Sequence, residues 1–449
     1  MLSIQYARFI PASNEPSDCL QAFGDCREGQ IPRPLGRFKF DAPLLAAGFL
    51  TYRYIENIYK RKSDENGNCE EDIDYVFFPY MVTMYDLYIK ELVVSDLQRT
   101  GRTKDIREDA ETLCNIDAVK EQYIRINFKK KNVSMDNAVR VVEANIKGKK
   151  KIPVISVGTT RQGNLRIAIA NIALKTSNFE RLVKGRPNRS YKRYKSLAHI
   201  VNSAIAEKAD MLVLPEACVP IEWLPTLIRT CTKNNMALIT GIEHIIYEER
   251  VYNYTAVTLP YEEPGYKCAV LSLHLKNHYA PHEAELIHGY RLNEISGKGY
   301  ELYHWKDCWF PVYCCFELAS IEDRALFSAY ADVLVAVEWN KDTNYYSNIL
   351  EALSRDLHCY CVQVNSSDYG DSRITMPSKT EMKDIIKTKG GNNATVLVGT
   401  IDYEKLRDFQ FKEYNLQKMN KEFKPTPPLF DKEVVGKKIR GKLEDFVSS

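Results

Sequence analysis

The 449-residue chain lacks the features that define several broad classes of protein. Its longest apolar runs, such as APLLAAGFL, are far shorter than the ~20 residues that span a bilayer, so we expect no membrane anchor. The first residues, MLSIQYARFIPASNEPSD, have neither the basic start nor the apolar stretch of a secretory signal peptide. We therefore expect a soluble, cytoplasmic protein.

Excess charge and a regular cysteine pattern are also missing. The 62 Lys+Arg and 59 Asp+Glu give a net charge of only +3, which provides no general argument for nucleic-acid binding. The 12 cysteines are irregularly spaced, and several lie in apolar, strand-like runs such as CYCVQV, so we expect free thiols in a reducing compartment. The sequon at Asn253 then carries no meaning for glycosylation. No internal repeat or low-complexity tract is present.

What the chain does have is enough apolar material, 45% of residues, for a large core in more than one domain. We expect residues 1–150 to form a mostly helical or mixed accessory region of unknown fold. Ser134 is positioned to cap a helix that runs through Ile146. That helix ends in KGKKK, and we interpret residues 151–163 as a solvated linker and not a nucleic-acid patch, because no aromatics are interleaved. Residues 421–449 are interpreted as a C-terminal tail.

Residues 164–420 show a regular alternation of strands and helices. The run LRIAIANIAL alternates and is β-branched, as is typical of a strand, whereas SYKRYKSLAHIVNSAIAEKA has apolar residues at helical spacing. Similar pairs follow along the segment, with additional paired strands between them. This pattern predicts a layered α/β domain with buried sheets.

Three chemically distinct side chains follow strand-like runs: Glu216 after LVLP, Lys276 after VLSLHL and Cys315 after PVYC. Residues just beyond strand ends line the crevice of layered α/β folds. A thiol with a pKa of ~8.5 needs a base and a cation to react at neutral pH. Glu216 can accept its proton, and Lys276 can stabilise the thiolate and an oxyanion. Singly, each residue has a plainer role: a helix cap, a surface lysine or a buried thiol.

The pair Cys314 and Cys315 requires a choice between two thiols. Side chains alternate along PVYCC, so Cys314 shares a face with Val312, a core residue, and we expect it to be buried and unreactive. Cys315 lies at the turn after the strand, where backbone N–H groups and Lys276 are expected to favour its thiolate. Glu317 is expected to orient this turn.

A metal site is a weaker hypothesis. Four histidines suggest it: His274, His278, His282 and His288. The first three fall four residues apart, but the segment leaves an alternating strand and contains Pro281, which interrupts helical periodicity. Cys359 and Cys361 offer a second candidate set. We expect no metal at either place.

Residues 164–410 resemble the nitrilase (carbon–nitrogen hydrolase) superfamily. LVLPEACVP is similar to the family's glutamate motif, and the Lys276 segment with Pro281 and Glu283 to its lysine motif. Cys315-Phe316-Glu317 is similar to the family's Cys-aromatic-acidic motif. Later landmarks are EWN, LSRD, VQVNSS, GDSRI and GTIDYEKL.

This resemblance implies a four-layer α-β-β-α sandwich over residues 164–420, and it implies a role for each site residue. Glu216 is the general base, Lys276 the oxyanion cation and Cys315 the nucleophile. Glu283 is the supporting glutamate, with Glu285 as the competing choice, and the Phe316 N–H is the second oxyanion donor. The implied reaction is hydrolysis of a small amide, nitrile or carbamoyl compound through a thioester. No cofactor is implied, and a homo-oligomer is expected.

Several departures from the family pattern affect the substrate pocket. Pro311 replaces a usual glycine, Ala319-Ser320-Ile321 replaces Arg-Phe-Pro, His358 replaces a common glutamate, and PSKTEMKDIIKTKGG is an atypical insert. Candidate pocket walls are Trp223, Trp339 and Asn340, although burial is the plainer role for the tryptophans.

A second functional hypothesis follows from these departures and from the unassigned N-terminal region. The domain would then be a nitrilase-like recognition or signalling module of a larger protein, such as a reverse-transcriptase-associated defence protein. The chain itself has no Tyr-x-Asp-Asp polymerase motif.

Overall fold

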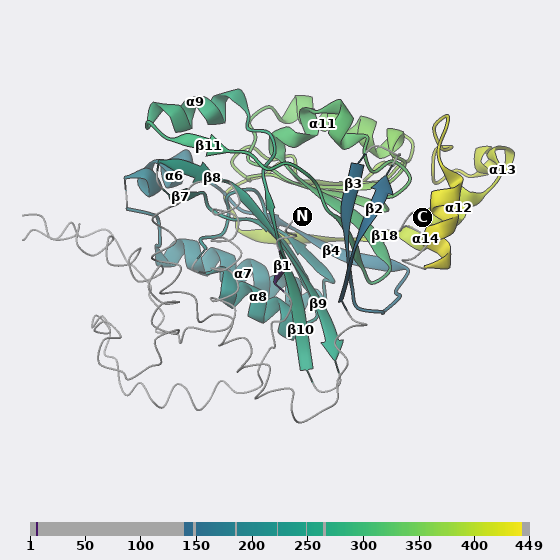
Figure 1. Cartoon of the computed structure of the whole chain (residues 1–449), viewed down its shortest axis with the longest axis horizontal. Coiled ribbons are helices and arrows are strands. Elements are labelled where there is room, and N and C mark those ends of the chain that lie inside the picture. Colours follow the sequence, from purple (N-terminus) through teal and green to yellow (C-terminus); the bar gives the residue numbers. More distant parts are fainter. Residues whose placement is uncertain are drawn as a thin grey trace, which may run out of the picture.

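The computed structural model describes residues 6–7, 139–146, 150–184, 186–221, 223–247, 249–263 and 266–441. Within these ranges the strands form two large sheets and a small one (Figure 1). In order across the first sheet are β1 (Tyr6–Ala7), β10 (Tyr266–Leu275), β9 (Tyr254–Glu263), β6 (Ala237–Gly241), β5 (Met211–Val213), β4 (Asn164–Asn171) and β18 (Thr395–Asp402). The second has β17 (Asp384–Lys387), β16 (Arg373–Thr375), β15 (Tyr360–Val364), β14 (Val333–Val337), β13 (Cys308–Cys314), β12 (Leu302–Trp305), β3 (Lys150–Val157) and β2 (Val139–Ile146). The small sheet has β11 (Asn293–Ile295), β8 (Arg250–Tyr252) and β7 (Ile245–Tyr247).

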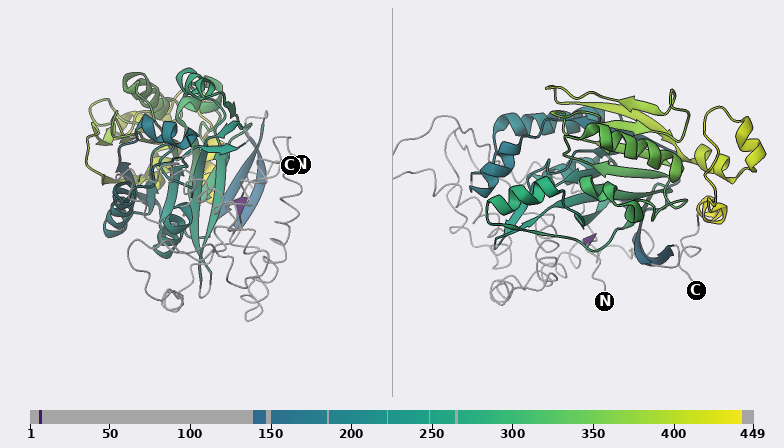
Figure 2. Two further views of the ribbon diagram at one scale, coloured as in Figure 1. Left: turned by 90° about the vertical axis from the view of Figure 1, so that its left-hand side faces the viewer. Right: turned by 90° about the horizontal axis from the view of Figure 1, so that it is seen from above.

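Helices cover the outer faces of the two large sheets (Figures 1 and 2). The longer ones are α6 (Thr176–Val183), α7 (Tyr191–Ala206), α8 (Leu224–Lys233), α9 (Pro281–Gly289), α11 (Thr343–Asp356), α12 (Tyr403–Phe411) and α14 (Lys432–Arg440). Helices α7 and α8 pack on the first sheet and α11 on the second, while one large apolar core joins the facing sides of the sheets. The four-layer α-β-β-α arrangement expected from the sequence is therefore confirmed.

The second sheet has a buried parallel centre, of which β14 is an example. Its sequence VLVAV is buried along its whole length, with Val335 in the core between the sheets and Leu334 in the core under α11. A strand apolar on both faces is typical of the buried interior of a parallel sheet. Because β13, β14 and β15 run parallel, the residues that follow them lie at one edge of the sheet.

Three expectations about the ends of the domain need correction. The prediction of a helix from Ser134 to Ile146 is wrong over its described part, because Val139–Ile146 form the strand β2. The segment interpreted as a linker begins with β3, which pairs with β2 and β12 in the second sheet. The C-terminal segment includes α14, which packs against α12. Ser134, the rest of residues 1–138 apart from β1, and residues 442–449 lie outside the described residues.

Helix α14 is held to the second sheet by buried charges. The Lys438 Nζ lies 2.8 Å from Asp332 Oδ1, and Arg407 of α12 donates to the same carboxylate through Nε at 2.9 Å. Asp332 in turn accepts the Trp309 N–H of β13 at 2.9 Å, so the ion cluster connects the last described helix to the strand that leads to Cys315. None of the helices described here is long and apolar enough to cross a membrane.

Candidate active site

The structure brings Glu216, Lys276 and Glu283 together. The Lys276 Nζ lies 2.7 Å from Glu216 Oε1 and 2.5 Å from Glu283 Oε2. The Lys276 side chain is fully buried, and those of Glu216 and Glu283 are only 2% and 15% exposed. Glu216 follows β5, Lys276 follows β10 and Glu283 lies in the first turn of α9. Glu283, and not the exposed Glu285, contacts the lysine.

Two further side chains hold the carboxylates in place. The Asn253 Nδ2 donates to Glu216 Oε1 at 2.7 Å and to Glu283 Oε1 at 2.9 Å, and the His244 Nε2 lies 3.3 Å from Glu283 Oε1. Asn253 is fully buried, so these bonds are made away from water. Both carboxylates are therefore fixed relative to each other as well as to Lys276.

Burial and charge act against each other in this cluster. Burial alone disfavours the charged form of Lys276, but Glu216 and Glu283 raise its pKa well above the usual value. Burial likewise opposes ionisation of Glu283, but Lys276 and His244 lower its pKa to about 2. Lys276 is therefore an ammonium and Glu283 a carboxylate at neutral pH.

The loop that carries Glu216 packs directly on β6. A Cβ placed on Gly241 would lie 2.4 Å from the Glu216 Cα, a separation that real atoms do not reach. The Gly241 N–H donates to Pro215 O at 3.1 Å, and the Cys218 N–H donates to Gly241 O at 3.1 Å. Only glycine allows this close approach, which fixes the depth at which the Glu216 side chain enters the site.

Cys315 occupies a sharp turn at the end of β13. It begins the 3₁₀ helix η3 (Cys315–Ala319) with a φ of 46°, in the left-handed region that L-residues other than glycine rarely adopt. Cys314 packs with Val312 in the core between the sheets, whereas Cys315 belongs to neither apolar core. The two thiols therefore face different surroundings, as the strand alternation predicts.

The expectation that the Cys315 thiolate is favoured is wrong for the resting protein. Cys315 is only 5% exposed, and burial raises the pKa of its thiol well above the usual value, with Glu216 adding to the effect and Lys276 opposing it. Burial raises the pKa of Cys314 in the same way. Cys315 is therefore a neutral thiol until its proton is removed, and Glu216 and Lys276 are the charges that act on it most strongly.

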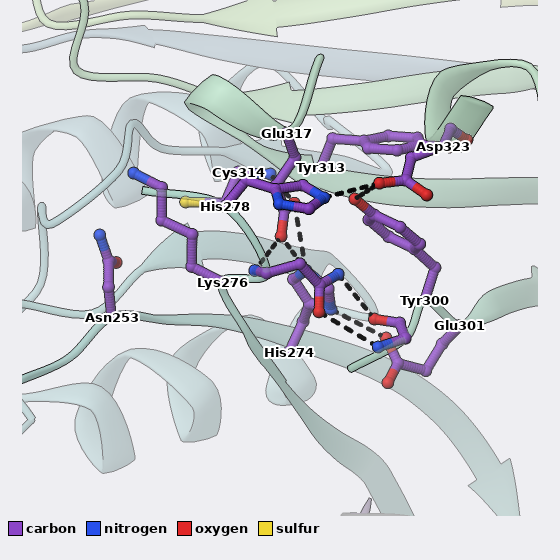
Figure 3. A network of polar contacts seen from close by, with 12 residues as sticks. Asn253, His274, Lys276, His278, Tyr300, Glu301, Tyr313, Cys314, Glu317 and Asp323 are labelled. Atoms are coloured by element: carbon purple, nitrogen blue, oxygen red, sulfur yellow. Dashed lines mark hydrogen bonds and ion pairs between the residues drawn. The ribbon is translucent and has the colours of Figure 1, made fainter. Parts of the chain in front are cut away.

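Glu317 connects the lysine strand to the cysteine turn (Figure 3). It accepts the Cys314 N–H at 2.6 Å and the Asn277 N–H at 2.5 Å, which are the amides next to Cys315 and Lys276 in the chain. The His274 Nε2 lies 3.0 Å from Glu317 Oε1. One buried carboxylate thus sets the position of the thiol turn relative to the lysine.

His274 links Glu317 to a second carboxylate. Its Nδ1 lies 3.1 Å from Glu301 Oε2. Burial disfavours the imidazolium, but Glu317 and Glu301 raise the pKa of His274 to about 10. A charged histidine between two carboxylates holds this part of the network together at neutral pH.

Of the remaining predicted site residues, some lie beside the glutamate cluster or the cysteine turn and one lies in the main core. Phe316 is the second residue of η3, where an N–H has no acceptor within the helix. Trp339 lines a small pocket with Ala217 and His244, next to the glutamate cluster. Asn340 is tied to Asn365 by a backbone N–H bond of 2.9 Å. Trp223 instead packs on Tyr194 in the main core and does not line this pocket.

The histidines considered as metal ligands are dispersed. His274 lies in β10, His278 in the following loop beside Asp323, and His282 and His288 in α9. Among the residues that the structure describes, no group of three or more His, Cys, Asp or Glu side chains is arranged to hold a metal ion.

The sequence does not indicate the roles of Asn253, His244, His274 and Glu338 in the site region, although Glu338 is part of the EWN landmark. The sequence identifies Asn253 only as part of a sequon and His274 only as a candidate metal ligand. Glu338 directly precedes the two residues chosen as pocket walls. A polar residue at the end of an otherwise apolar strand was the available signal for Glu338, as it was for Glu216 and Lys276.

No protein-family model and no curated protein matches the chain. Similar solved structures include an amidase from Nesterenkonia sp., with 15% identity over 58% of this chain and 98% of that chain and a TM-score of 0.40. Another is a CN-hydrolase superfamily protein from Xanthomonas campestris, with 14% identity over 58% of this chain and 98% of that chain and a TM-score of 0.40. A third is a mutant of the amidase from Nesterenkonia sp. AN1 with a covalent acetamide adduct on its active-site cysteine; it is 14% identical over 58% of this chain and 99% of that chain, with a TM-score of 0.39. At these identities and TM-scores, the roles of residues in this chain rest on its own geometry.

Proposed function

We propose that this chain hydrolyses a non-peptide carbon–nitrogen bond of a small amide, nitrile or carbamoyl compound. The observation that carries the proposal is the Lys276 ammonium, which is fully buried between Glu216 and Glu283 and acts electrostatically on Cys315. Base, cation and thiol are the three groups that a thiol hydrolase requires. The resemblance of residues 164–410 to the nitrilase superfamily supports the same function.

For an amide, the reaction starts from the neutral thiol. Glu216 accepts the Cys315 proton while the sulfur attacks the carbonyl carbon, and the oxyanion that forms is stabilised by the Lys276 ammonium and the Phe316 N–H. The carbon–nitrogen bond then breaks, and the leaving nitrogen takes the proton from Glu216. A thioester on Cys315 remains.

Water completes the cycle. Glu216, again a carboxylate, accepts a proton from water as its oxygen attacks the thioester carbon. The carbon–sulfur bond breaks, the sulfur recovers the proton, and the carboxylic acid leaves. Glu283 and Asn253 take no proton in this scheme; they keep Lys276 charged and in place.

The test compares the two neighbouring cysteines. Native protein is treated with limiting iodoacetamide, the adduct is mapped by peptide mass spectrometry, and ammonia release from butyramide is measured for Cys315→Ala and Cys314→Ala. Of these two thiols we expect Cys315 to take the label, and we expect activity to be lost in Cys315→Ala but retained in the matched Cys314→Ala. Preferential labelling of Cys314, or hydrolysis that survives in Cys315→Ala, contradicts the proposal. A folded wild-type protein that hydrolyses no amide or nitrile favours the recognition-module hypothesis.

A further inference from the structure

Glu338 lies beside the cysteine turn, at the end of the adjacent strand. In the parallel pair β13 and β14, Cys314 is in register with Val337, so the next residues along the two strands are Cys315 and Glu338. Neighbouring strands are about 4.8 Å apart. Glu338 is fully buried, and in its ionised form it raises the pKa of the Cys315 thiol.

Glu338 begins a row of polar side chains whose hydrogen bonds are incomplete. The Gln363 Nε2 donates to Glu338 Oε2 at 3.0 Å, and Arg373 lies opposite Gln363 in register. Four atoms of this row are buried and without a hydrogen-bond partner among the described residues: Glu338 Oε1, Gln363 Oε1, Asp371 Oδ2 and Arg373 Nε. With Glu338 ionised, three are acceptors and one is a donor, so in that state the row is better suited to a ligand that donates hydrogen bonds.

The charges around the row favour a cation over an anion. The positive charge of Lys276 balances only one of the two carboxylates that it contacts, Glu216 and Glu283. Arg373 balances Asp371, to which it is hydrogen bonded. His244, 3.3 Å from Glu283, is a further cation when protonated, so the balance is negative in either case once Glu338 is ionised. A carboxylate on a substrate would be repelled here, whereas an ammonium would be attracted.

We propose that Glu338 and Gln363 bind an amine group of the substrate. This rests on the proposed hydrolase function and names its substrate class: an amide with a primary amine two or three bonds from the scissile carbonyl. The short separation follows from the adjacent positions of Cys315 and Glu338. Glu338 is then the residue that determines specificity, and Cys315 remains the residue that reacts.

Proton transfer accompanies binding. Burial raises the pKa of Glu338 well above the usual value, with Glu216 and Asp371 adding to the effect and Gln363 and Arg373 opposing it, so the free protein holds Glu338 neutral. An amine in its neutral form takes the Glu338 proton, which leaves an ammonium paired with a carboxylate. No other reactant is needed. The titratable and charged groups that act on or respond to Glu338 are Glu216, Cys315, Tyr346, Asp371 and Arg373.

The experiment compares two amides of the same size, butyramide and 3-aminopropanamide. The measured quantity is the ratio of their kcat/KM values. We expect wild type to prefer the amino compound by about tenfold or more, a difference of ~1.4 kcal/mol. Glu338→Gln should lose most of that preference. The exposed loop variant Glu381→Gln, which also removes one carboxylate, should keep it.

A second readout does not depend on turnover. Propylammonium should protect Cys315 from iodoacetamide in wild type but not in Glu338→Gln, and propanol should protect neither. Wild type that hydrolyses butyramide without preferring the amino compound overturns the inference and leaves the hydrolase function standing. Protection without hydrolysis supports the amine site and refutes the hydrolase function. A Glu338→Gln variant with lower Tm and an unchanged ratio means that Glu338 and Gln363 only stabilise the strand ends.

Discussion

Replacing Lys276 with methionine separates the electrostatic role of this residue from its bulk. Methionine is also long and unbranched, so the apolar part of the side chain is kept. The ammonium is lost, and Glu216 and Glu283 are left 2% and 15% exposed without their counter-charge. Breaking a buried ion pair on one side costs ~3–5 kcal/mol. We expect the free energy of unfolding, measured by urea titration, to fall by about that amount.

The kcat of Lys276→Met should also fall, for a reason that is independent of the loss of stability. Removing one oxyanion donor typically costs about 10²–10³ in kcat, or ~3–4 kcal/mol of barrier. The loss should appear in kcat, measured by ammonia release, because Lys276 stabilises a charge that forms only in the transition state. A change confined to KM contradicts the oxyanion role and indicates a binding role.

A second substitution distinguishes catalysis from stability. Wild type has one cation and two carboxylates in the cluster, and Lys276→Met/Glu283→Gln restores the same net charge. Much of the lost stability should return in the double variant, because the repulsion between the two carboxylates is removed. Turnover should stay low. Recovery of turnover together with stability would refute the reasoning and make Lys276 a structural residue.

Three other substitutions test separate parts of the site. Glu216→Gln should remain folded yet lose ~100-fold or more in turnover, as expected for a positioned general base; near-normal turnover removes Glu216 from the mechanism. Cys315→Gly should be more stable than Cys315→Ala by ~1 kcal/mol in urea unfolding, because only glycine accepts a φ of 46° without cost; equal stabilities contradict this. His274 has its pKa raised to about 10, so its stabilising effect is complete below pH ~6.5 and is lost as pH rises through 10. Wild type should therefore lose stability more steeply than His274→Gln over that window, and parallel profiles would show that the ion pairs contribute nothing.

The position of the reactive groups could be predicted because it depends on local rules. Apolar strands that run parallel end at one edge of a sheet, so polar residues just after them meet there, as Glu216 and Lys276 do. Strand alternation likewise predicts that Cys314 enters the core and Cys315 does not. Both inferences need only the spacing of residues along single strands.

The partners of these groups could not be predicted because they depend on distant segments. Asn253 contacts carboxylates 37 and 30 residues away, and His274 contacts Glu317 across 43 residues. No local pattern encodes such pairings. The misread β2 has a different cause: VRVVEANI contains apolar residues at spacings that fit either a helix or a strand, and its pairing with β3 decides the outcome.

The buried Asp332–Arg407–Lys438 cluster has a consequence for biosynthesis. Asp332 precedes β14, yet its partner Lys438 is 106 residues further along the chain. Domains generally fold as units while the chain emerges from the ribosome, N-terminal parts first. Until residue 438 has been made, the Asp332 carboxylate lacks its Lys438 partner and, among the described residues, has only Arg407 and the Trp309 N–H to pair with. The ion cluster beside β13 and β14 is therefore completed late in synthesis, when most of the described chain already exists.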